Sequence, residues 1–83
     1  MELKDTVELM VSDDWKKRLQ GEYYQVKIRK EALGERLRNM QGKSFTIDDA
    51  GEMNLLRRQY AAMNHYQTIL LQRIKADLIP IEE

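Results

Sequence analysis

The sequence has no cysteine and a single histidine, His65, and these shortages exclude common ways of stabilising a short chain. Disulfides are impossible, and one histidine without cysteine argues against an ordinary zinc site. A chain of 83 residues forms one domain at most. Folds near this size usually need a further constraint such as a disulfide, a metal or an oligomeric partner. We therefore predict no metal site and no cofactor, and we expect self-association to complete the core.

Long apolar runs are also missing, since no stretch approaches the roughly 20 apolar residues of a membrane span. Residues 1–17 have neither a basic start nor an unbroken apolar run, so we expect a cytoplasmic protein with no signal peptide and no membrane partner. Fourteen basic residues balance fourteen acidic ones, which argues against binding of duplex nucleic acid. Within residues 13–41, however, basic residues outnumber acidic ones.

Apolar residues at alternating steps of three and four predict a first long helix over residues 13–41. Ser12 is the expected N-cap, because two carboxylates follow it at the positive end of the helix dipole. Only Lys30 interrupts the apolar stripe. Residues 42–46, which include a glycine, are expected to form the turn.

A second long helix is predicted over residues 47–79, with Thr46 as its capping residue and Pro80 ending the pattern. Its stripe contains one polar position, Gln67. The expected core residues of the two helices are Leu19, Tyr23, Val26, Leu33, Leu37 and Met40 on the first and Met53, Leu56, Tyr60, Met63, Leu70 and Ile74 on the second.

The short turn makes the two helices antiparallel, and residues 1–12 form an N-terminal segment in which apolar spacing indicates a short extra helix. The predicted fold class is all-α, a single domain over residues 1–83. It is an antiparallel two-helix hairpin with a short N-terminal segment, completed by homo-oligomerisation.

Each long helix carries a second apolar row that a lone hairpin cannot bury, and this surplus indicates contacts with other copies. The second rows are Trp15, Tyr24 and Ile28 on the first helix and Leu55, Ala62, Tyr66, Ile69 and Leu71 on the second. Gly21 and Gly34 lie inside the first helix, where each costs about 1 kcal/mol relative to alanine. Either the helix tolerates them, or a neighbouring backbone or a ligand approaches closely at Gly21.

Catalytic patterns are scarce, and we predict that the chain is not an enzyme. His65 has no cysteine or strained serine motif to activate, so it is expected at the surface or in an interface. Asp48, Asp49 and Glu52 could hold a cation, but acidic residues in a first helical turn also complement the helix dipole. No glycine-rich phosphate loop is present.

Basic and aromatic residues gather on the first helix, where cations can pair with phosphates and aromatic rings can stack on bases. This cluster consists of Trp15, Lys16, Lys17, Arg18, Tyr23, Tyr24, Lys27, Arg29 and Lys30. The alternative is a solvated basic face whose aromatic residues belong to the core.

The spacing of particular residues resembles a phage helical-hairpin family that contains the anti-CBASS cyclic-nucleotide sponges and the related Thoeris anti-defence sponges. The similarity covers residues 13–78. It rests on Leu55, Leu56, Gln59, Met63, Tyr66, Ile69, Leu70, Arg73 and Ile74 in the second half, and on Asp14, Trp15, Arg18, Leu19, Glu22, Tyr23, Val26 and Arg29 in the first.

The resemblance implies a small oligomer, a hexamer in some members, that binds cyclic di- or trinucleotide signals of bacterial immunity between subunits and sequesters them without cleavage. The candidate ligand-binding residues are Trp15, Arg18, Tyr23, Arg29, Tyr66 and Arg73. Two alternatives remain open. One is a structural or adaptor coiled coil with no small ligand, and the other is a small nucleic-acid-binding regulator, which the zero net charge disfavours.

Overall fold

The computed structural model describes residues 1–41 and 47–81, and this part of the chain contains helices and no strand. The elements are a 3₁₀ helix η1 (Leu3–Thr6) and the α-helices α1 (Val7–Met10), α2 (Trp15–Gln41) and α3 (Ile47–Ala76). The prediction of an all-α fold is therefore confirmed. The expected turn over residues 42–46 lies outside the described residues. So does Thr46, the expected capping residue of the second helix.

The start of α2 differs from the sequence prediction, because Asp14 rather than Ser12 is the N-cap. The backbone N–H of Lys16 donates to Asp14 Oδ1 at 3.0 Å, which satisfies one of the unpaired donors of the first turn. Ser12 Oγ instead accepts from the N–H of Asp14 at 3.1 Å and so holds the chain that enters the helix. The carboxylate at the cap also complements the helix dipole, and α2 begins at Trp15.

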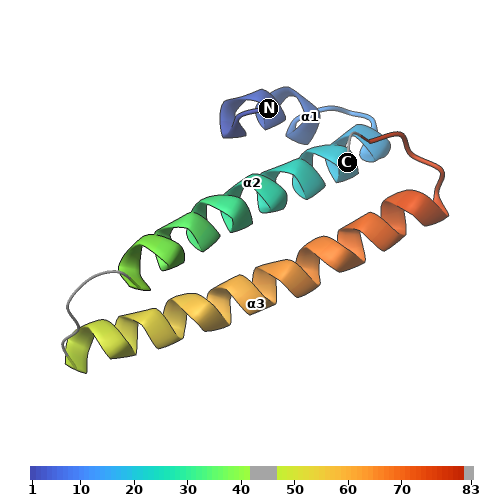
Figure 1. Ribbon diagram of the computed structural model, residues 1–83. Coiled ribbons are helices and arrows are strands. Elements are labelled where there is room, and N and C mark those ends of the chain that lie inside the picture. The colour runs from blue at the N-terminus through green and yellow to red at the C-terminus, as the bar shows by residue number, and fades with distance from the viewer. Residues whose placement is uncertain (42–46, 82–83) are drawn as a thin grey trace.

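The helices α2 and α3 lie side by side and run in opposite directions (Figure 1). Lys30 Nζ of α2 donates to Asn64 Oδ1 of α3 at 3.1 Å, and Arg36, further along α2, pairs with Glu52, which lies earlier on α3. The core cluster lies toward the end of the hairpin away from the 42–46 link. It contains Leu19, Tyr23, Val26, Leu70, Ile74 and Ile79, with Tyr24, Met63, Leu71 and Ile81 packed against it.

The end of α3 also differs from the prediction, since the helix stops at Ala76 and not at residue 79. The N–H of Leu78 donates to the carbonyl of Lys75 at 3.2 Å, and the N–H of Ile79 donates to that of Ile74 at 3.0 Å. This pair of bonds is a Schellman motif, which requires left-handed backbone at Leu78, where φ is 56°. Ile79 is thereby turned into the core beside Ile74.

The N-terminal segment, η1 and α1, packs against the first half of α2 (Figure 1). A Cβ atom placed on Gly21 would lie 2.9 Å from Leu9 Cβ and 3.0 Å from the backbone nitrogen of Met10. Of the two interpretations of Gly21, close approach of a neighbouring backbone is therefore the one the structure supports. A similar approach occurs at Gly34, where the added Cβ would lie 3.0 Å from the ring of Tyr60.

The two ends of the described chain meet over the same part of α2. Gln20 Nε2 donates to the carbonyl of Pro80 at 2.7 Å, and a hollow there is lined by Met1, Tyr24, Pro80 and Ile81. Among the described residues, no helix is both long enough and apolar enough to cross a bilayer.

Candidate functional site

Five of the six predicted binding residues are exposed, and the sixth is not. Trp15, Arg18 and Arg29 are exposed on α2, and Tyr66 and Arg73 are exposed on α3. The side chain of Trp15 is 47% exposed and that of Tyr66 is 42% exposed, so both rings are accessible to a ligand.

Tyr23 is buried in the core, with only 3% of its surface exposed. Its ring meets that of Tyr24 edge to face, with the ring centroids 5.5 Å apart. A ring held in this way cannot stack on a base, so Tyr23 is removed from the candidate site. The sequence placed Tyr23 both in the apolar stripe and in the basic aromatic cluster, and packing assigns it to the stripe.

The first turn of α2 brings an aromatic ring and two cations together. Lys16 Nζ lies 5.9 Å from the centroid of the Trp15 ring, a cation–π distance. Arg18 Nη1 donates to the carbonyl of Ser12 at 2.8 Å, which anchors the guanidinium to the chain before the helix. A guanidinium has five N–H donors, so this bond leaves others for an anion.

The exposed candidates lie on one face of the hairpin. Steps of three, four, seven and eleven residues return to the same side of an α-helix. Glu52 of α3 joins Arg36 of α2 across this face at 2.7 Å. We call it the arginine face. It consists of Trp15, Arg18, Arg29 and Arg36 on α2 and Leu55, Ala62, Tyr66, Ile69 and Arg73 on α3.

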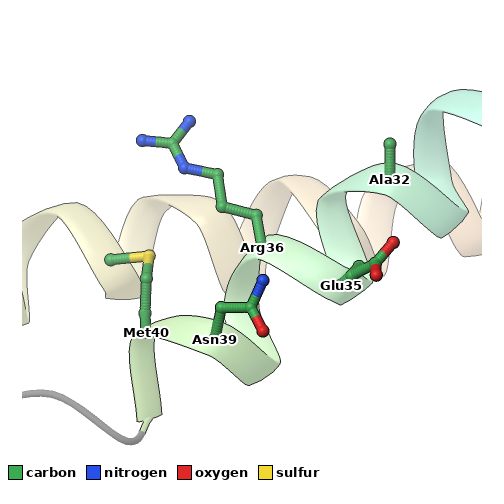
Figure 2. A pocket seen from close by; sticks show the side chains of 5 residues that line it. All are labelled: Ala32, Glu35, Arg36, Asn39 and Met40. Atoms are coloured by element: carbon green, nitrogen blue, oxygen red, sulfur yellow. The ribbon is translucent and has the colours of Figure 1, made fainter.

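A surface hollow of about 570 Å³ lies at the end of α2 near residue 41. The described residues that line it, Ala32, Glu35, Arg36, Asn39 and Met40, come from α2 (Figure 2). Arg36 is shared with the arginine face, but none of the six predicted binding residues lines the hollow.

A second group of polar residues lies between the helices, on the side of the hairpin opposite the arginine face. Lys30 Nζ bonds Asn64 at 3.1 Å and lies 5.9 Å from the centroid of the Tyr60 ring. Gln67 follows Asn64 by one turn of α3, and its Oε1 is buried with no hydrogen-bond partner among the described residues. We call Lys30, Tyr60, Asn64 and Gln67 the seam cluster.

The seam cluster lowers the stability of the hairpin where it interrupts the apolar stripes. A leucine buried at such a position contributes about 1.5–3 kcal/mol, whereas a buried acceptor without a donor costs about 1–3 kcal/mol. The predicted site missed this cluster. Its signal in the sequence was the pair of polar residues, Lys30 and Gln67, that break the two stripes.

In the part of the chain that the structure describes, no three potential metal-ligand side chains come together. The side chains of Asp48 and Asp49, considered above as cation ligands, lie outside the described residues. Glu52 pairs with Arg36 instead.

Comparison with known protein families finds a match to the family model described as Sequestin, over residues 13–76. The chain belongs to the Sequestin family. The Sequestin match begins at residue 13 and ends at the last residue of α3, so it covers the hairpin and leaves out η1 and α1. No curated protein and no solved structure matches the chain.

The family name fits a protein that sequesters a ligand, which agrees with the coarser part of the predicted function. Two surfaces of the Sequestin hairpin described above are candidates for holding a ligand. These are the arginine face and the seam cluster.

Proposed function

We propose that this Sequestin-family chain binds and sequesters cyclic di- or trinucleotide signals of CBASS-type bacterial immunity, as an immune-evasion protein of a phage. The family match over the hairpin carries the proposal. The resemblance to anti-CBASS and Thoeris anti-defence sponges covers nearly the same residues and supplies the ligand class. The signals are made in the host cytoplasm, and the protein would act there.

The arginine face has the chemistry that such a ligand requires. Guanidinium groups form paired hydrogen bonds with phosphate oxygens, and exposed aromatic rings stack on bases. Arg29 and Tyr66 lie at about the same level of the antiparallel hairpin, since their near neighbours Lys30 and Asn64 are in contact. Arg18, Trp15 and Arg73 lie toward the open end. The resemblance implies that the ligand is held and not cleaved.

We also propose that the chain self-associates, with a second copy of the chain as the partner. Leu55, Tyr66 and Ile69 are exposed on α3 at heptad spacing, as in the seam of a coiled coil. In an antiparallel pair of two such rows, the small side chain of Ala62 meets the large ring of Tyr66. The row thus complements itself, as a two-fold interface requires. The resemblance extends this to a hexamer with ligands between subunits.

Ligand binding can be tested by thermal unfolding with a panel of cyclic di- and trinucleotides and cyclic ADP-ribose signals. A ligand that binds only the folded state must raise the melting temperature. Arg29→Ala should weaken binding by about 1.5–3 kcal/mol, because it removes a charged hydrogen bond. Arg38→Ala is the matched control, since nine residues place Arg38 on the opposite side of α2.

Ligand released by heating from the wild-type complex should be recovered intact by chromatography. If no member of the panel raises the melting temperature, the structural or adaptor coiled coil becomes the better interpretation. A linearised product would mean that the chain is an enzyme.

A further inference from the structure

The seam cluster places a cation, an aromatic ring and two side-chain amides between α2 and α3. Lys30 uses one of its three N–H donors on Asn64, at 3.1 Å, which leaves two donors for another acceptor. Lys30 is only half-buried, so its amine can be reached from solvent. The ring of Tyr60 lies against Gly34 on α2, and this contact fixes one wall of the cluster.

A second lysine, Lys27, lies at the same level of the hairpin as Gln67. Because α2 and α3 are antiparallel, the turn of α2 before Lys30, which carries Lys27, lies beside the turn of α3 after Asn64, which carries Gln67. Lys27 is half-buried, and no carboxylate lies within ion-pair distance of it in the described residues, although Glu31 follows one turn later.

Oε1 of Gln67 is an acceptor that the described chain leaves unused, and because it is buried in this conformation, a ligand reaches it when the half-buried Gln67 side chain turns outward. Lys27 and Lys30 come from the turns of α2 that lie at the level of Gln67 and Asn64, and they supply donors and positive charge. A ligand that satisfies both must be an anion that also carries an N–H or O–H group, as a nucleotide does with its phosphate and its base or ribose.

We propose that the seam cluster, with Lys27, is a phosphate-binding site in which the two lysines hold a phosphate group and Gln67 accepts a hydrogen bond from the attached nucleoside. The identification of that nucleoside with a cyclic oligonucleotide rests on the proposed function, but the phosphate chemistry does not.

The experiment uses the full chain, labelled with ¹⁵N, and follows the side-chain NH₂ resonances of Asn64 and Gln67 by NMR. One arm adds the cyclic nucleotides of the panel, and the other adds inorganic pyrophosphate. Both resonances should shift in the wild type and in Lys17→Met, whose substituted residue is exposed on the outer side of α2. In Lys30→Met the shifts should be lost and the affinity for the probe should fall about tenfold or more.

The outcomes separate this site from the proposed function. Nucleotide binding that leaves the Asn64 and Gln67 resonances unmoved overturns the site while the proposed function stands. Shifts with pyrophosphate but with no nucleotide support the site and count against the proposed function. If neither probe moves these resonances, or if Lys30→Met responds as the wild type does, the seam cluster is only a contact between helices.

Discussion

Gly21 is the residue at which the N-terminal segment comes closest to α2. Its missing Cβ leaves room for Leu9 and for the backbone nitrogen of Met10, which a methyl group would approach to 2.9 and 3.0 Å. Backbone held by its own hydrogen bonds cannot move aside as a flexible side chain can. Alanine at this position would therefore push α1 away from α2, even though alanine is the better helix former.

We predict that Gly21→Ala lowers the free energy of unfolding by about 1–3 kcal/mol, the usual cost of overpacking, and speeds amide exchange in η1 and α1. Gly51→Ala is the matched control, because no described atom lies within 4 Å of the added Cβ on α3. It should raise stability by about 1 kcal/mol through helix propensity alone. Equal stabilisation by the two substitutions would show that the N-terminal segment does not dock at Gly21.

Among the elements, α3 ends at a motif that its sequence does not signal. The Schellman motif requires left-handed backbone, which is usually supplied by glycine, but here the residue is Leu78. The side chain of Leu78 is 89% exposed and contributes no packing, so the strain at this residue is not offset by burial of its own side chain. The motif persists because it turns Ile79 into the core.

Leu78→Gly should stabilise the protein by about 1 kcal/mol, since it removes the left-handed strain and loses no buried surface. Leu78→Ala keeps a Cβ at the same φ and should leave stability nearly unchanged. Chemical denaturation of both variants measures the difference. If the glycine variant were no more stable than the alanine variant, the left-handed turn would not be what ends α3.

The long helices could be predicted from the sequence because their periodicity is a local property of each segment. Their ends could not, since Ser12 and Asp14 can both act as caps and the path of the entering chain decides between them. At the other end, Pro80 was the visible stop signal, whereas a tertiary contact of Ile79 stops the helix earlier.

The same distinction applies to the candidate site: features set by one helix could be predicted, and features set by the pairing of two helices could not. Exposed residues such as Trp15 and Arg29 could be assigned to the surface from their helical positions. The side on which Tyr23 packs, and the meeting of Lys30 with Asn64, depend on how the two helices pair, and no pattern within one helix specifies that register.

For the whole molecule, the exposed apolar row on α3 is the surface through which we expect the chain to self-associate. Leu55 is 62% exposed and Ile69 is 41% exposed, on a chain whose buried core is small. Burial of such side chains in an interface is favourable by about 25 cal/mol for each Å² of apolar surface. An isolated hairpin leaves this contribution unused, and pairing with a second copy recovers it.

Leu55→Asp combined with Ile69→Asp should therefore dissociate the oligomer, because each carboxylate would have to be desolvated in the interface. Light scattering after size exclusion should show several copies per particle for the wild type and a mass near 9.9 kDa for the double variant. Circular dichroism should show that the double variant stays helical, since both positions lie outside the core. Leu70→Asp, at a fully buried residue, should instead unfold the chain.

Ala61→Asp is the control, because it adds a carboxylate to an exposed position of α3 that lies off the row. It should leave the mass of the particle unchanged. A wild-type chain that is a folded monomer at micromolar concentration would contradict self-association altogether. Dissociation by Ala61→Asp as well would instead place the interface on another side of α3, and the pairing of Ala62 with Tyr66 would then be wrong.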